Sequence, residues 1–293
     1  MKSSTSAPLF NQAYPRGSQA FADLVQHNVQ LALAEDIGGG DITASLIPAT
    51  QQANASIISR EAAIICGLDW VNGCFQQLDK NIQIKWLVND GDKVMPNQLL
   101  CEIAGDARAL LSAERCALNF LQTLSAVATQ TREYVDAIAG LGSQILDTRK
   151  TLPGLRLAQK YAVTVGGGIN QRLALYDGIL IKENHIAAAG GIATAIKQAV
   201  NLNQNISIQI EVENLDELQQ ALAANASNIL LDNFTHAEMR EAVKLNNGRA
   251  LLEASGNVSL STIRDIAATG VDRISIGALT KNIRAIDLSM RIK

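Results

Sequence analysis

The sequence is poor in several residue types that often reveal a specialised function. Only 4% of its 293 residues are aromatic, and 25 Lys and Arg are balanced by 28 Asp and Glu, giving a net charge of −3. No run of basic residues interleaved with aromatics occurs, which disfavours a nucleic-acid-binding module. No apolar run is long enough to cross a bilayer. With 47% apolar residues, the chain is typical of a globular protein of one or two domains.

Cysteine is also scarce, and its spacing excludes the common metal and redox motifs. The four cysteines show neither zinc-ligand spacing nor a C-x-x-C pair, which favours free thiols in a reducing compartment. A cytoplasmic location follows as an expectation. The cysteines are Cys66, Cys74, Cys101 and Cys116.

The first half of the chain has a mixed pattern. Residues 1–20 are rich in Ser, Gln, Asn and Pro and lack the apolar core of a signal peptide, so we expect a flexible leader. From Phe21 to about Arg115, a helical pattern and a glycine-rich loop (EDIGGGDIT) precede strand-like runs, including IQIKWLV and QLLCEIAG around a predicted turn at residues 89–92. This region is predicted to form an α+β sandwich.

From about Ser143, short apolar segments alternate with amphipathic ones. Strand–helix alternation at this spacing predicts a parallel sheet, and nearly continuous apolar strands favour a barrel. The region around 166–168 is irregular, so an eight-stranded closure is not supported, and a doubly wound open sheet is the competing arrangement. The six clear strands are QILDTR, DGILIKEN, SIQIEVEN, NILLDN, ALLEASG and RISIGAL.

Each of these predicted strands ends in charged or small polar residues. In a parallel α/β barrel the carboxyl ends of the strands share one face, where sites are built. A single polar end can be an ordinary helix cap, as we expect for Asp216 and Thr235, but six such ends indicate a site. They comprise residues 147–150, 182–184, Glu211 with Glu213, 232–233, 253–257 and 275–277.

The charges at these ends fall into two sets. A basic set of Arg149, Lys150, Arg172 and Lys182 implies a ligand with several negative groups, whereas Lys160 is expected on a helix surface. The acidic pair Glu211 and Asp232 would repel that ligand unless Mg²⁺ or sugar hydroxyls lie between them. The small-residue turns after the last two strands favour phosphate binding; they contain Ser255, Gly256, Asn257, Ser275 and Gly277.

These residues lie within motifs that resemble a known family. The segments LSAERCALNFLQ, ILDTRKTLPGLRLAQKYAVTVGGG, LIKENH, IEVEN, LLDNF, ASGN and IGALTK are together similar to quinolinate phosphoribosyltransferase, also called carboxylating nicotinate-nucleotide pyrophosphorylase. The resemblance implies an α/β sandwich (residues 21–117 with 284–293) and an open barrel of about seven strands carrying the active site (residues 118–283). It also implies a homodimer, or a higher oligomer, with shared active sites.

The resemblance further implies roles for individual residues. Arg115 would reach the site of the other subunit, and Arg149 and Arg172 would bind the two quinolinate carboxylates. Lys150 and Lys182 would bind the pyrophosphate and substrate anions. Glu211 and Asp232 would hold the ribose hydroxyls and, indirectly, Mg²⁺ bound to phosphoribosyl pyrophosphate (PRPP). The phosphate pockets would be lined by Ser255, Gly256, Asn257, Ser275 and Gly277, and no organic cofactor is implied.

One position departs from the family pattern. The family commonly has Asn-His-Arg where this chain has Asn170-Gln171-Arg172. Glutamine can donate a hydrogen bond but cannot shuttle a proton near neutrality as histidine can. We therefore expect Gln171 to bind substrate, while Lys150, Lys182, Glu211 and Asp232 remain the candidate catalytic residues.

The implied reaction transfers phosphoribosyl from PRPP to quinolinate with decarboxylation, in de novo NAD biosynthesis. A transferase acting on an acid with one carboxylate is the rival enzyme; the candidate arginines argue for two carboxylates, because an unpaired buried cation is costly. A non-catalytic phosphosugar-binding scaffold is the rival outside catalysis, and the intact pair Glu211 and Asp232 disfavours it.

Overall fold

The computed structural model describes residues 7–202 and 206–292, and the chain divides into two compact units. Unit 1 comprises Met1–Arg132, Thr151–Gly167 and Leu279–Lys293, and unit 2 comprises Glu133–Lys150 and Gly168–Ala278. The expected boundary after residue 117 lies inside the long helix α4 (Ala107–Ala137), as does the division between Arg132 and Glu133. Among the described residues, no helix is long and apolar enough to span a membrane.

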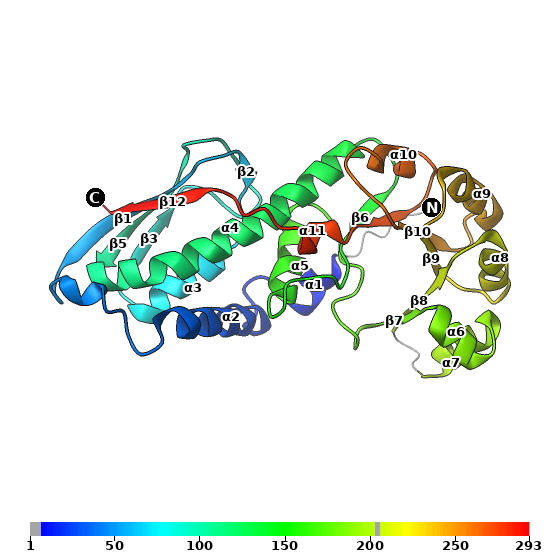
Figure 1. Cartoon of the computed structure of the whole chain (residues 1–293), viewed down its shortest axis with the longest axis horizontal. Coiled ribbons are helices and arrows are strands. Elements are labelled where there is room, and N and C mark those ends of the chain that lie inside the picture. Colours follow the sequence, from blue (N-terminus) through cyan, green and yellow to red (C-terminus); the bar gives the residue numbers. More distant parts are fainter. Residues whose placement is uncertain (1–6, 203–205, 293) are drawn as a thin grey trace. The chain divides into compact units, whose positions relative to one another are not determined.

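Unit 1 is built on an antiparallel sheet with the strand order β12-β1-β5-β3. The predicted strands IQIKWLV and QLLCEIAG do pair with each other, as β3 and β5, but the connection between them is longer than the predicted turn. It contains β4, which pairs instead with β2. Figure 1 shows β12 at the sheet edge beside β1. The strands are β1 (Gln52–Ser59), β2 (Ala63–Ile64), β3 (Gln83–Trp86), β4 (Lys93–Val94), β5 (Leu99–Asp106) and β12 (Leu288–Ile292).

The helices of unit 1 supply most of its apolar core. On α3 the buried residues include Trp70, Val71 and Phe75, spaced so that they share one face. All four cysteines are free and buried, as the sequence predicts, and burial raises the pKa of the Cys101 thiol to about 12. The helices are α1 (Leu9–Ala13), α2 (Gln19–Ile37), the 3-10 helix η1 (Ala44–Leu46), α3 (Leu68–Leu78), α4, α5 (Arg156–Val165) and α11 (Ala278–Lys281), whose first residue belongs to unit 2.

The expectation of a flexible leader over residues 1–20 is wrong for its later part. Residues 9–13 form helix α1, and Phe10 is fully buried, with its ring 5.6 Å from that of Tyr161 and 6.3 Å from that of Phe21. Polar composition could not reveal this, because one aromatic side chain is enough to dock a short segment. Residues 1–6 lie outside the described residues.

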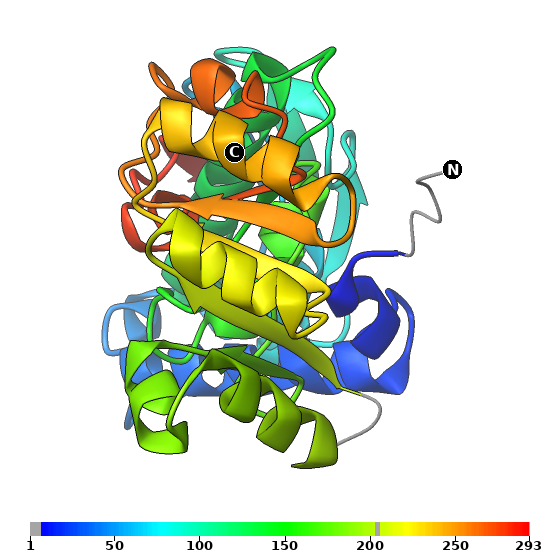
Figure 2. The same ribbon diagram turned by 90° about the vertical axis from the view of Figure 1, so that its right-hand side faces the viewer.

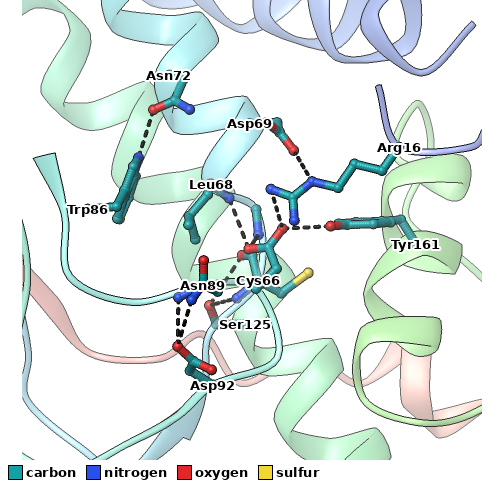
Figure 3. A network of polar contacts seen from close by, with 12 residues as sticks. Arg16, Cys66, Leu68, Asp69, Asn72, Trp86, Asn89, Asp92, Ser125 and Tyr161 are labelled. Atoms are coloured by element: carbon teal, nitrogen blue, oxygen red, sulfur yellow. Dashed lines mark hydrogen bonds and ion pairs between the residues drawn. The ribbon is translucent and has the colours of Figure 1, made fainter. Parts of the chain in front are cut away.

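A polar network joins the beginning of unit 1 to helices α3 and α5 (Figure 3). The buried carboxylate of Asp90 accepts hydrogen bonds from the Tyr161 hydroxyl (2.6 Å) and from the backbone N–H groups of Gly67 (2.8 Å) and Leu68 (3.2 Å) at the start of α3. The guanidinium of Arg16 lies 3.9 Å from Asp90 and 3.1 Å from Asp69. Burial nevertheless dominates and raises the pKa of Asp90. The network therefore anchors three segments that are distant in sequence.

Unit 2 contains a parallel sheet of six strands in the order β6-β11-β10-β9-β8-β7. An isolated bridge from Leu146 to Ile169 adds a seventh position beside β6, after the irregular glycine segment that the sequence predicts. The sheet has a barrel-like α/β arrangement, and no eighth strand forms within the described part of unit 2. The strands are β6 (Gln144–Leu146), β7 (Gly178–Ile181), β8 (Ser207–Val212), β9 (Asn228–Asp232), β10 (Leu251–Ser255) and β11 (Arg273–Ser275).

Helices cover one face of this sheet. Figure 2 shows α7, α8 and α9, coloured from green to orange, as a row in front of the strands. Their buried residues recur at helical spacing, as with Leu218, Ala221 and Leu222 of α8. Because side chains alternate along a strand, residues such as Ile210 and Val212 face one side while Gln209 and Glu211 face the other. The helices of unit 2 are α6 (Glu183–Ala189), α7 (Ile192–Leu202), α8 (Leu215–Ala223), α9 (His236–Asn246) and α10 (Ile263–Ala267).

Candidate active site

The carboxyl ends of the unit 2 strands meet in register at one edge of the sheet. Ser255 pairs with Asp232, and Glu211 pairs with Leu230, two residues before Asp232. Since residues two apart in a strand share a face, Glu211 and Asp232 project to the same side from neighbouring strands. On the other side of β10, Ser275 of β11 pairs with Leu146 of β6. The sheet thus brings the sequence-predicted polar ends together.

Lys182 and Glu211 form an ion pair at this edge. The Lys182 Nζ atom lies 2.7 Å and 3.0 Å from the two carboxylate oxygens of Glu211. The Lys182 side chain is 43% exposed, and a pair so open to water contributes at most about 1 kcal/mol to stability. An anionic ligand can therefore compete for Lys182 at little cost.

Lys182 is also held at its backbone. Its N–H donates to Nδ1 of His185 (3.1 Å), which is exposed and completes the capping box of α6. Because His185 is exposed, it does not pack beneath the site. Its contact fixes the backbone from which the Lys182 side chain leaves the strand.

Arg149 and Arg172 lie close enough to repel each other. Burial and the neighbouring Arg149 guanidinium lower the pKa of Arg172. Arg172 donates one hydrogen bond to the Gly178 carbonyl (2.8 Å), and its buried Nε has no hydrogen-bond partner among the described residues. Two adjacent guanidinium groups of like charge are favourable only beside anions, because each can bind a carboxylate or phosphate through paired N–H groups.

The segment that carries Arg172 is fastened to the end of β6. The buried Asp147 carboxylate accepts from the Asn170 side chain (2.7 Å) and from the Gln171 backbone N–H (3.0 Å). The side-chain Nε2 of Gln171 donates to Oε1 of Gln209 (2.7 Å). These bonds hold the position at which the chain departs from the family pattern.

The turn after β10 lies against the end of β9. Gly256 has φ +105°, and a Cβ atom there would lie 2.2 Å from Oδ1 of Asn233, so only glycine fits without displacing that side chain. Asn233 in turn donates to the Asp232 carboxylate (2.8 Å). The next helix, α10, begins at Ile263.

The turn after β11 is lined by Lys150. A Cβ atom at Gly277 would lie 3.0 Å from Cδ and 3.9 Å from Nζ of Lys150. Gly277 directly precedes α11. The glycine therefore leaves room for the lysine side chain beside a backbone turn, an arrangement suited to a phosphate.

Two other sequence expectations are corrected by the structure. Lys160 is fully buried on α5 in unit 1, instead of lying on a helix surface, because the whole middle of α5 is enclosed. Asp216 lies in the first turn of α8, whose N-cap is Asn214, whereas Thr235 does cap α9. Arg115 is an exposed residue of α4 in unit 1.

Two buried polar residues lie beneath the strand ends; sequence reasoning missed Gln209, and it listed Glu253 among the polar strand ends without giving it a role. Gln209 is 6% exposed and Glu253 is 1% exposed, and Nε2 of Gln209 donates to Oε2 of Glu253 (2.9 Å). A signal was present: Gln209 lies two residues before Glu211, and Glu253 two residues before Ser255, so each shares a strand face with a predicted site residue.

The strand-end edge of a parallel α/β barrel-like sheet, with paired guanidinium groups and small-residue turns, defines an enzyme class that acts on substrates with several negative groups. Comparison with known families specifies the class further. Residues 41–125 match the family model of the quinolinate phosphoribosyl transferase N-terminal domain, and residues 127–291 match that of its C-terminal domain. The chain belongs to the quinolinate phosphoribosyltransferase family.

Individual relatives agree with this assignment. The chain is 41% identical over 259 residues to the probable carboxylating nicotinate-nucleotide pyrophosphorylase of Bacillus subtilis, covering 88% of this chain and 90% of that protein. It is 40% identical over 285 residues to the mitochondrial decarboxylating quinolinate phosphoribosyltransferase 2 of Nicotiana glauca, covering 90% and 81%. The solved nicotinate-nucleotide pyrophosphorylase of Francisella tularensis superposes with a TM-score of 0.90 at 50% identity, covering 93% of this chain and 97% of that one.

Proposed function

We propose that the strand-end residues of unit 2 carry the reaction of this family, the transfer of phosphoribosyl from PRPP to quinolinate with decarboxylation. The products are nicotinate mononucleotide, pyrophosphate and CO₂, and the pathway is de novo NAD biosynthesis. The assignment is supported by the effect of the Arg149 charge on Arg172, whose pKa is lowered first by burial and then by that charge, since two guanidinium groups in one region match a substrate with two neighbouring carboxylates.

Quinolinate binds with its carboxylates at these two arginines. Gln171 adds an uncharged contact from the same segment, held by Asp147 and Gln209. An acid with one carboxylate would leave one of two half-buried guanidinium groups without an anion, which is costly. The site therefore prefers quinolinate to nicotinate.

PRPP binds along the remaining strand ends. Glu211 and Asp232 accept the ribose hydroxyls and would hold, indirectly, the Mg²⁺ that PRPP carries, since magnesium in proteins is usually held by one or two carboxylates plus substrate phosphates. The two carboxylates on one strand face fit that pattern, and no cluster of three or more potential metal ligands occurs in the described ranges. Lys150 and Lys182 bind the pyrophosphate and substrate anions, and the phosphate pockets use Ser255, Gly256, Asn257, Ser275 and Gly277.

Positioning and electrostatics suffice for the chemistry. The pyridine nitrogen attacks C1 of the ribose as pyrophosphate leaves, so the protein needs no nucleophile of its own. Positive charge that develops on the sugar is stabilised near Glu211 and Asp232. Once quaternised, the positive ring nitrogen stabilises the electron pair left on the adjacent ring carbon when its carboxylate departs as CO₂, and that carbon then takes up a proton. Decarboxylation therefore follows ring attachment, and trapping a free decarboxylated acid before the nucleotide forms would refute this order.

A homodimer with shared sites completes the proposal. Arg115 lies one helical turn after Leu111 on α4, and both are exposed. Beside them lies a loop that is tied to α4 by the hydrogen bond from Ser112 to Asp41 (2.7 Å) and that exposes Ile42 (88%) and Leu46 (83%). Clustered apolar exposure of this kind favours an interface, through which Arg115 would reach the site of the other subunit.

The shared site is tested by mixing two inactive proteins. Arg115→Ala and Arg149→Ala are each expected to lose activity, but a mixed dimer contains one site with both arginines intact. Activity regained on mixing supports a shared site. No recovery despite proven subunit exchange would contradict it.

The reaction itself is tested with a product assay. Quinolinate and nicotinate are each supplied with PRPP and Mg²⁺, and CO₂ and mononucleotide are measured. Formation of both products from quinolinate alone is expected, and turnover of nicotinate alone would reassign the substrate. For location we propose the cytoplasm, supported by the four free, buried thiols. Fractionation of cells that express the chain tests this.

A further inference from the structure

A row of three hydrogen-bonded side chains runs from the interior of unit 2 to the quinolinate site. It begins at Glu253 of β10, passes through Gln209 of β8 and ends at Gln171, with heavy-atom distances of 2.9 Å and 2.7 Å. Glu253 and Gln209 are buried and Gln171 is half-buried. Water therefore cannot readily replace a missing partner in the inner part of this row.

The carboxylate gives the row a direction. An ionised carboxylate only accepts hydrogen bonds, so Gln209 must turn its NH₂ group toward Glu253 and its oxygen toward Gln171. Gln171 must then use its own NH₂ group for the inner contact. Two amides alone could bond in either direction, and the terminal carboxylate is what removes this ambiguity.

Burial of the Glu253 carboxyl group is energetically unfavourable. Burial raises its pKa, while contacts with Gln209 and Ser275 and the charge of Arg273 lower it and Asp147 raises it. Its Oε1 atom also has no hydrogen-bond partner among the described residues. An apolar residue would stabilise the interior better, so a carboxyl group at this position calls for a role beyond packing.

We propose that Glu253 is a positioning residue of the quinolinate site: acting through Gln209, it holds the Gln171 amide in one orientation toward the bound pyridine acid. This inference rests on the proposed function of the site. It also explains how glutamine can replace the histidine common in the family, since a histidine ring N–H could donate to Gln209 in the same direction.

A double-mutant cycle tests the proposal. Glu253→Gln keeps the volume but can either donate or accept, so the direction of the row is lost. We expect the Kd and KM for quinolinate to rise about fivefold, the equivalent of one ordinary hydrogen bond, with KM for PRPP and kcat within about twofold. In a Gln171→Ala background the same change should have no further effect on quinolinate binding.

Controls separate this role from a structural one. Glu241→Gln, on the exposed face of α9, should change neither the Kd nor the KM for quinolinate. If Glu253→Gln does not fold, Gln209→Met breaks the row at its centre and should reproduce the coupling to Gln171. The proposal would be overturned if the rises in quinolinate Kd caused by Glu253→Gln and Gln171→Ala multiply in the double variant. It would also be overturned if Glu253→Gln raised the KM for PRPP as much as the KM for quinolinate.

The readout also distinguishes this inference from the function on which it rests. Quinolinate affinity is measured by calorimetry without PRPP, and turnover is measured separately. If the unmodified enzyme binds quinolinate but does not turn it over, the proposed reaction is contradicted. The coupling between Glu253 and Gln171 can still be measured in that case from the Kd for quinolinate. Failure to bind quinolinate would overturn both.

Discussion

One acidic residue from each unit illustrates two opposite uses of a carboxylate. In unit 1, Asp90 is enclosed and accepts hydrogen bonds from two backbone N–H groups and from Tyr161. In unit 2, Glu211 is paired with the partly exposed side chain of Lys182. A carboxylate saturated by fixed donors stabilises a fold, whereas one that faces a flexible cation can exchange that partner for a ligand.

The basic residues show the same contrast. Arg16 of unit 1 lies beside Asp69 and Asp90, so its charge is compensated within the protein. In unit 2, burial and then the charge of Arg149 lower the pKa of Arg172, and Asp177 only partly offsets them, so like charges act on each other there. Adjacent like charges are therefore a better indicator of the binding site than the number of charged residues.

The largest effect is expected from Arg149→Ala. Removing one guanidinium of the pair should lower kcat/KM for quinolinate at least about a thousandfold, because a carboxylate would be left without its charged donor. The thermal midpoint should stay level or rise, since repulsion of Arg172 is relieved. Steady-state kinetics and thermal unfolding check both. A large fall in stability would place Arg149 with the structural charges of unit 1.

Glu211→Gln should have the next largest effect. Loss of the negative charge near the reacting sugar is expected to lower kcat about a hundredfold. Glu213→Gln is the matched control, because Glu213 follows β8 but is exposed. Equal effects of the two substitutions would show that only the general negative charge of the edge matters.

Asp90→Ala, unlike the two substitutions above, should lower the stability of the protein while leaving kcat unchanged. Two backbone N–H groups and the Tyr161 hydroxyl would lose their acceptor, at a cost of about 3 kcal/mol in the free energy of unfolding. The control Asp92→Ala removes a carboxylate that accepts from Asn89 at the protein surface and should cost much less. Denaturant unfolding and kcat, measured on each variant, test the contrast.

The same substitution has a signature in the pH dependence. The pKa of Asp90 is raised in the folded protein above its ordinary value of 3.8, so the folded state holds this proton more tightly. Stability from this group is present below that ordinary value and is lost as pH rises through the folded pKa. Asp90→Ala should remove this part of the pH dependence. The similar contribution of Glu253, whose pKa is also raised by burial, should remain in that variant.

The smallest effect is expected from Gln171→His. A ring N–H can still donate to Gln209, so kcat/KM for quinolinate should change less than about threefold. The pH dependence of kcat between about 5 and 8 should gain no new step from histidine titration. A large gain in kcat with such a step would show that the position moves a proton.

The sequence predicted the parallel sheet of unit 2 better than it predicted the fold of unit 1. The six parallel strands follow from nearly continuous apolar runs, and the carboxyl-end residues follow from where those runs stop. The burial of Phe10 and Lys160 could not be predicted in this way, because it depends on which segments enclose them. Gln209 was missed, and Glu253 was listed only as part of a polar strand end, because a polar residue inside a strand does not reveal whether it faces helices or a site.

The sequence by itself determined the local secondary structure of this protein and the family to which it belongs. Alternation of apolar and polar residues sets the strands, turn glycines fit where a side chain would collide, and the family motifs identify the reaction. Tertiary structure alone decided which polar groups act on one another, since Gln209 contacts both Gln171 and Glu253 only when the strands align in one register. Electrostatic energy depends on distance and burial, and the fold sets both quantities.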